Sequence, residues 1–211
     1  MTAILLEGIS RSFPPLDQGA IAPAEWNRFL SLPDDYRGLL LAHNGGFLED
    51  ERYTFSTGVP YRTETVDNPS RTDWPLEFYG IPTTSEPGRW PEDLFRLAEE
   101  HASEEFLPSN VIAIARCSQN SLVCLSVAGG DRGAVYYWDW YWQYPWCESF
   151  FRERITEAKR RLPDYSAALR DPSHPRYRET MDALNAATVV RLADSLPAWL
   201  AGCEDQRRQG G

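Results

Sequence analysis

The chain has 211 residues and a formal net charge of −10, with 42% hydrophobic, 25% charged and 13% aromatic residues. This composition excludes an intrinsically disordered protein and indicates a globular protein with a sizeable core. The acidity disfavours direct binding to nucleic acid, which needs basic groups to displace counterions from phosphates. Because no stretch approaches the roughly 18 apolar residues of a membrane span, we expect a cytoplasmic protein.

The first third of the chain is predicted to begin with two short helices. An apolar stripe and a starting proline predict a helix over residues 23–30. A second helix follows Leu32-Pro33, with Asp34 and Asp35 in its first turn to complement the helix dipole. It is predicted to stop at Asn44-Gly45-Gly46, because these residue types adopt positive φ most readily. The triplet has neither the Lys-Ser/Thr nor the helix of a phosphate-binding loop.

Three adjacent carboxylates, Glu49, Asp50 and Glu51, are predicted to form a solvated turn. The turn would join residues 47–48 and 53–55 in a hairpin. A loop rich in proline and glycine then runs over residues 57–91, with Trp74 and a short strand candidate inside it. Such a long loop usually binds something or covers the core. It is followed by a predicted helix to about residue 102.

The centre of the chain is predicted to form three antiparallel strands. Residues 111–115 and 122–127 are almost continuously apolar, which is typical of strands covered on both faces. The third strand is predicted over residues 134–142 and includes Tyr136-Tyr137-Trp138-Asp139-Trp140-Tyr141-Trp142. Alternation puts aromatic rings on both of its faces. Either both faces are buried, or one is core and the other binds another molecule.

The remainder is predicted to be mainly helical. Helices are expected over residues 147–162 and 176–187, followed by a strand over 188–192 and a last helix capped by Asp194 or Ser195. Charge is uneven along the chain, because residues 1–147 carry a net −11 whereas residues 148–178 carry +3. The acidic body would favour a basic partner, although surface carboxylates also serve solubility alone.

The cysteines and histidines form no motif for a metal or for catalysis. The four cysteines lack CxxC spacing and a nearby His pair, so we expect neither a zinc site nor a redox motif, and no cofactor. Cys124 lies in an apolar strand and is interpreted as a core residue. A hydrolase that uses Asp139 with His43 or His101 is the enzymatic alternative, but no spacing of nucleophile and base supports it.

Several motifs, taken in order, resemble the SUKH superfamily, the bacterial relatives of a fungal cell-wall synthesis regulator. The residues that carry the resemblance are Trp26, Leu32, Pro33, Tyr36, Asn44, Gly45, Gly46, residues 111–115, residues 122–127, Tyr137 and Trp138 within Val135–Asp139, and residues 196–200. Residues 144–187 fall outside the resemblance and are interpreted as a helical insertion. We therefore predict a single domain over residues 1–205 and a polar tail over residues 206–211.

The resemblance implies an α+β fold with a central, mostly antiparallel sheet of about five or six strands flanked by helices. The insertion would precede the last strand and helix. It further implies a non-enzymatic immunity protein that binds a cognate polymorphic toxin, often a nuclease, and covers its active site or substrate groove. A regulatory or scaffold protein with a cellular partner is the alternative. The candidate contacts with a basic toxin are Glu49, Asp50, Glu51, Trp74, Asp139, Trp140 and Trp142.

Overall fold

The computed structural model describes residues 4–28, 30–49, 51–59, 61–62, 67–68, 71–83, 90–118, 120–143 and 145–209. Side chains are described in these ranges apart from residues 61–62, 67–68, 142–143, 145–148 and 204–209.

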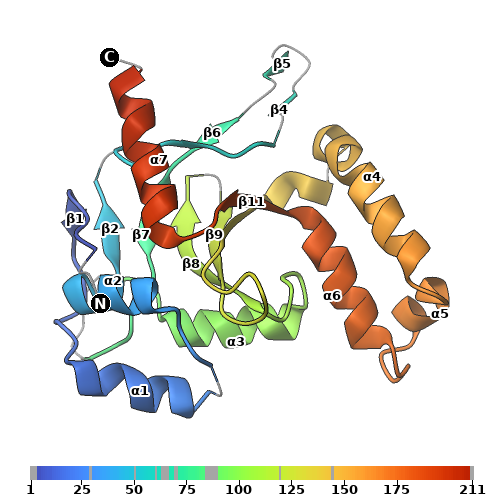
Figure 1. Ribbon diagram of the computed structural model, residues 1–211, viewed down its shortest axis with the longest axis horizontal. Coiled ribbons are helices and arrows are strands. Elements are labelled where there is room, and N and C mark those ends of the chain that lie inside the picture. Colours follow the sequence, from blue (N-terminus) through green and yellow to red (C-terminus); the bar gives the residue numbers. More distant parts are fainter. Residues whose placement is uncertain are drawn as a thin grey trace.

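One seven-stranded antiparallel sheet organises the molecule (Figure 1). Its order is β1-β2-β7-β8-β9-β10-β11, and the strands are β1 (Ile9–Ser10), β2 (Gly46–Leu48), β7 (Pro75–Phe78), β8 (Val111–Cys117), β9 (Leu122–Ser126), β10 (Val135–Trp138) and β11 (Val189–Ala193). Two smaller sheets pair β3 (Phe55–Ser56) with β6 (Thr72–Asp73) and β4 (Tyr61–Arg62) with β5 (Asp67–Asn68).

The helices complete an α+β fold, as predicted. They are α1 (Gln18–Trp26), α2 (Asp34–Ala42), α3 (Leu94–Glu104), the 3₁₀ helix η1 (Trp140–Gln143), α4 (Pro145–Arg161), α5 (Tyr165–Arg170), α6 (Tyr177–Thr188) and α7 (Leu196–Gln209). Three of them, α4 to α6, lie between β10 and β11, where the helical insertion was expected. They form a lobe beside β11 (Figure 1).

Both faces of the central strands are buried, which confirms the prediction from their continuous apolar sequences. Trp199 of α7 packs on one face against Phe78, with ring centroids 6.3 Å apart. Tyr137 lies on the same face of the sheet as Phe78, because the strand pairing connects Phe78 to Tyr137 through Ala115 and Val123. Trp138, the next residue along β10, points to the opposite face and meets Phe106, just beyond α3, at 4.6 Å. The paired aromatics of β10 therefore serve both layers of the core.

The first helix differs from its prediction. It runs over Gln18–Trp26 rather than residues 23–30, and its buried residues are Ile21 and Glu25. Glu25 accepts hydrogen bonds from Arg37 Nη2 at 2.6 Å and from the Leu32 backbone N–H at 2.6 Å. Because these bonds hold the Glu25 side of the helix inward, Trp26 turns outward and is 79% exposed. The expectation of Trp26 as an apolar structural residue is wrong.

The hairpin predicted around the acidic turn is also wrong. β2 pairs with β1 on one edge and with β7 on the other, so both of its hydrogen-bonding edges are occupied. Phe55–Ser56 pairs instead with β6.

The other structural residues predicted from the family resemblance are buried. They are Leu32, Pro33, Tyr36, Asn44, Gly45, Gly46, Tyr137 and Trp138.

The Asn44-Gly45-Gly46 turn has the structural role that was predicted, with a different geometry. Helix α2 ends at Ala42, and positive φ occurs at Gly45 (+70°) and Gly46 (+137°) rather than at Asn44. A Cβ atom on Gly45 would lie 2.7 Å from the backbone N of Gly80. The side chain of Asn44 bonds both the N–H and the C=O of Ile81, at 2.8 Å each. The turn is therefore a close backbone contact as well as a chain reversal.

Candidate partner-binding surfaces

Most of the contacts predicted from sequence gather at one end of the sheet. Because each strand is antiparallel to its neighbour, β2, β8 and β10 run in the same direction and their carboxyl ends meet there. We call this the loop end; it is the upper end in Figure 1. It carries Glu49 and Glu51 after β2, Trp74 before β7, and Trp140 after β10.

The loop end is broad enough for a protein partner. β2 and β10 are four positions apart in the strand order, a separation of about 19 Å at the usual spacing. Glu49 and Glu51 are exposed on the β2 side, whereas Trp140 is 54% exposed on the β10 side. Trp74, between them, is half-buried. Asp50 lies outside the described residues, as does the side chain of Trp142.

Asp139 is not a surface contact, and its assignment to the partner-binding set is wrong. Its side chain is buried and accepts a hydrogen bond from Arg71 Nη1 at 2.6 Å. The other carboxylate oxygen accepts from the backbone N–H of Tyr141 at 2.8 Å. Burial raises the pKa of the Asp139 carboxyl, and the positive charge of Arg71 opposes that rise. Asp139 is a structural residue beneath the loop end.

A second buried carboxylate extends this polar cluster across the sheet. Asp73 accepts from the Tyr137 hydroxyl at 2.8 Å and from Ser118 Oγ at 2.6 Å. Its carboxylate also lies 3.7 Å from Arg71 Nη2. Arg71, Asp73, Tyr137 and Asp139 therefore tie β6 to β10, and we call them the buried network. Since a buried charge without a partner is costly, these groups hold one another in fixed positions.

The buried network explains why the aromatic strand is shorter than predicted. β10 ends at Trp138, and the bond from Tyr141 N–H to Asp139 turns the chain into η1. The strand alternation predicted through residue 142 therefore stops, and Trp140 leaves the sheet. Its ring packs edge-on against that of Trp138, with centroids 5.8 Å apart. Trp140 is consequently exposed but held from below by a buried tryptophan.

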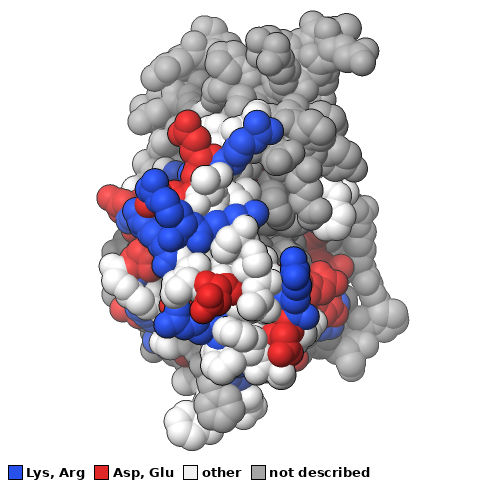
Figure 2. Space-filling view, turned by 90° about the vertical axis from the view of Figure 1, so that its right-hand side faces the viewer, with Lys and Arg blue, Asp and Glu red and all other residues white. Residues whose placement is uncertain are grey.

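The helical lobe presents a mixed, partly neutralised basic face. Figure 2 shows Lys and Arg side chains over this side of the molecule, with carboxylates among them. Part of the positive charge is paired within α4, where Glu157 binds both Arg160 and Arg161. The lobe therefore carries the excess of basic residues predicted from sequence, but not as a uniform patch.

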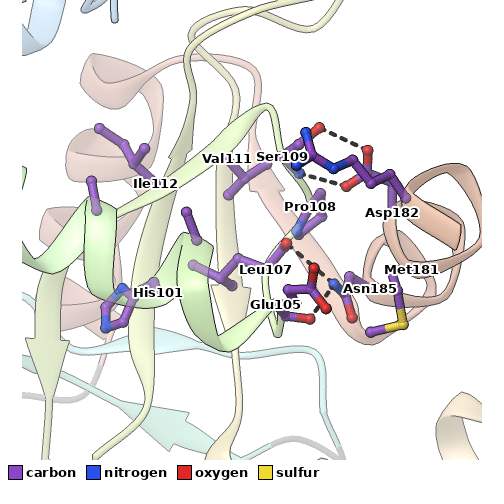
Figure 3. A pocket seen from close by; sticks show the side chains of 13 residues that line it. His101, Glu105, Leu107, Pro108, Ser109, Val111, Ile112, Met181, Asp182 and Asn185 are labelled. Atoms are coloured by element: carbon purple, nitrogen blue, oxygen red, sulfur yellow. Dashed lines mark hydrogen bonds between the residues drawn. The ribbon is translucent and has the colours of Figure 1, made fainter. Parts of the chain in front are cut away.

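A groove between α3 and α6 was missed by the sequence interpretation (Figure 3). It has a volume of about 420 Å³. Its lining residues are Ala98, His101, Ala102, Glu105, Leu107, Pro108, Ser109, Val111, Ile112, Arg178, Met181, Asp182 and Asn185. The two walls are far apart in the sequence, so no local pattern could reveal it.

Hydrogen bonds fasten α6 to the segment between α3 and β8. Asp182 accepts from the Ser109 backbone N–H at 2.9 Å and from the Ser109 hydroxyl at 2.8 Å. Asn185 Nδ2 donates to the backbone C=O groups of Glu105, at 2.7 Å, and Leu107, at 3.2 Å. These bonds are drawn in Figure 3. They fix the distance between the two walls, so the groove is preformed.

His43, His101 and Cys124 occupy structural positions. His43 Nε2 accepts from the Leu6 backbone N–H at 3.0 Å, and His101 packs edge-on against Phe106. Burial lowers the pKa of both imidazoles. Cys124 is fully buried in β9, which confirms its interpretation as a core residue, and burial raises the pKa of its thiol. Among the described residues, no group of three or more His, Cys, Asp or Glu side chains is placed to hold a metal ion.

The sequence matches the SMI1 / KNR4 family (SUKH-1) over residues 15–159. The chain belongs to this family. The match begins before α1 and ends within α4, so it includes the loop end and the α3 wall of the groove. α5, α6, β11 and α7 lie beyond it. Comparison with curated proteins and with solved structures gives no significant match.

The SUKH-1 match ends at residue 159, inside the predicted insertion over residues 144–187, so it does not test that insertion. Trp138 of β10 pairs directly with Val189 of β11, so residues 139–188 leave and re-enter the sheet at adjacent points. This is the geometry of an excursion between two neighbouring strands. The assignment of residues 144–187 as an insertion stays a prediction.

No helix in the described ranges is both long enough and apolar enough to cross a membrane.

Proposed function

We propose that this SUKH-1 family member is a cytoplasmic immunity protein that binds a cognate toxin and neutralises it by covering its active site or substrate groove. In this proposal the chain acts by binding and performs no chemistry. Family membership supports an immunity role in general terms. The specific toxin-binding role rests on the loop end.

The observation that carries the proposal is the way in which Trp140 is presented. The indole of Trp140 is 54% exposed, yet it packs on Trp138. It also follows a turn that the Arg71–Asp139 ion pair fixes. Tryptophan is enriched among the residues that dominate binding energy at interfaces. A side chain already held in place loses little conformational freedom on binding. Trp140 is therefore suited to anchor a protein partner.

The carboxylates on the other side of the loop end suit a basic toxin. Glu49 and Glu51 are exposed, and the first 147 residues have a net charge of −11. Such a surface attracts a basic protein over a distance of about one Debye length, roughly 10 Å at 0.1 M salt. This attraction would raise the association rate more than the final affinity. A toxin that binds nucleic acid would carry the required basic groups.

Co-expression with the product of the neighbouring gene tests the proposed function. The chain should restore growth to cells that make the toxin and should co-purify with it. Rescue without co-purification would contradict neutralisation by binding. Binding to a product that has no effect on growth would instead favour a regulatory or scaffold protein.

A further inference from the structure

The groove between α3 and α6 combines an apolar floor with space above it. The groove is lined on its apolar side by Leu107, Val111 and Ile112, at the start of β8 and just before it, and we call these residues its floor. On the α3 wall, the lining residues Ala98 and Ala102 have small side chains that leave the groove open. The volume of about 420 Å³ is within the range of natural ligand sites. Large apolar side chains from another molecule would fit this shape.

The rim of the groove is acidic. Glu105 and Asp182 line it, and the exposed Glu104 ends α3 directly before Glu105. Arg178 is the cationic residue in the lining. Within the described ranges, no Lys or Arg forms an ion pair with Glu104, Glu105 or Asp182. The rim therefore keeps an excess of negative charge beside an apolar floor.

We propose that this groove binds an amphipathic segment of a partner protein, with apolar side chains on the floor and Lys or Arg side chains against the rim. Helix-in-groove recognition uses this combination of an apolar strip and flanking charge. The hydrogen bonds of Asp182 and Asn185 keep the walls in place before the segment arrives. This binding does not depend on the toxin-binding role of the loop end.

Methyl NMR on the full chain tests the proposal with a synthetic probe. The probe is a helical peptide of about 12 residues, with leucines three and four positions apart on one face and lysines at the positions that flank this leucine stripe. Its titration should shift the methyl resonances of Leu107, Val111 and Ile112 in a saturable way. Raising the salt from about 0.05 to 0.5 M should weaken binding about tenfold, because the rim charges are screened. A peptide with glutamate in place of every lysine should not bind measurably.

Matched variants separate the groove from the rest of the surface. Ala102→Trp, which fills the groove from the α3 wall, should abolish the methyl shifts. Ala167→Trp, at an exposed position on α5 outside the lining, should leave them unchanged. Glu104→Gln should reduce the salt dependence of the affinity for the lysine peptide, and the fold should be unchanged. Absence of shifts at millimolar peptide, equal binding of the glutamate peptide, or full binding by Ala102→Trp would overturn the proposal. Methyl shifts that depend on the concentration of the chain alone, without peptide, would also overturn the proposal, because they would show that a second copy of the chain occupies the groove.

Discussion

Arg71 and Asp139, 68 positions apart in the sequence, form a buried ion pair with a 2.6 Å hydrogen bond between Nη1 and Oδ2. Both side chains are at most 5% exposed. The pair joins the residue before β6 to the residue between β10 and η1, and so determines where η1 begins. The presentation of Trp140 depends on this contact.

Removing one partner of the pair should destabilise the fold strongly. Asp139→Ala leaves the Arg71 charge buried, and we expect a loss of about 3–5 kcal/mol in the free energy of unfolding. The double variant Arg71→Met/Asp139→Leu should cost less than the sum of the two single variants, because neither Arg71 nor Asp139 is left without the other, while Asp73 keeps its hydrogen bonds from Tyr137 and Ser118. Urea unfolding at neutral pH measures these values. Additive costs would show that the two side chains are not energetically coupled.

The turn at Gly45 should tolerate no side chain. Gly45→Ala adds a Cβ that would lie 2.7 Å from the backbone N of Gly80, in addition to the strain of positive φ. Gly133→Ala is the control, because Gly133 also has positive φ but a Cβ atom there would meet no other group within 4 Å. The strain alone is about 1–2 kcal/mol. Thermal unfolding should therefore show a larger loss for Gly45→Ala, and equal losses would refute the close contact.

Stability should fall as the pH drops from about 7.5 to about 5.5. His43 must be neutral to accept the Leu6 N–H, and burial lowers the pKa of both His43 and His101. The unfolded chain therefore takes up protons first, below about pH 6.5, and protonation favours unfolding. Near His101, Glu100 and Glu104 oppose the lowering and Arg96 adds to it. The double variant His43→Gln/His101→Gln should lose less melting temperature over this range than the wild type. An equal loss would assign the effect to other groups.

Neutralising the exposed carboxylates should slow association with the toxin. In Glu49→Gln/Glu51→Gln, the association rate constant at low salt should fall several-fold, with little change in dissociation. The difference should vanish near 0.5 M salt, where screening reduces the attraction. Glu153→Gln/Glu179→Gln, exposed on the helical lobe, is the control of equal charge. Stopped-flow mixing gives the rates, and a wild-type rate at every ionic strength would exclude steering by this turn.

The sequence predicted elements whose signal is local. The continuous apolar runs of β8 and β9 and the amphipathic pattern of α4 depend on neighbouring residues, and their positions were close to those observed. The exposure of Trp26 was missed because it follows from Glu25, which bonds Arg37 twelve positions away. Helical spacing alone cannot show that a carboxylate, rather than an indole, will be buried.

The binding surfaces depend on contacts that no sequence pattern records. Asp139 was predicted as a surface contact because it lies between aromatic residues that could bind a partner. It is buried instead, because it pairs with Arg71, 68 positions earlier. The α3–α6 groove depends on Ser109 and Asp182, which are 73 positions apart. Trp140 and Glu51, both among the predicted contacts, are exposed. Their common position at the loop end required the strand order.

The affinity of the chain for the toxin encoded beside its gene, measured by titration calorimetry for two tryptophan variants, tests the central claim most directly. Trp140 and Trp26 are both exposed, but Trp26 lies on α1, away from the loop end. Trp140→Ala should weaken binding by about 2–4 kcal/mol, the range of an interface hot spot, while the chain stays folded and loses only the packing of Trp140 on Trp138. Trp26→Ala should bind like the wild type. Wild-type affinity for Trp140→Ala, or an equal loss for Trp26→Ala, would contradict binding through the loop end.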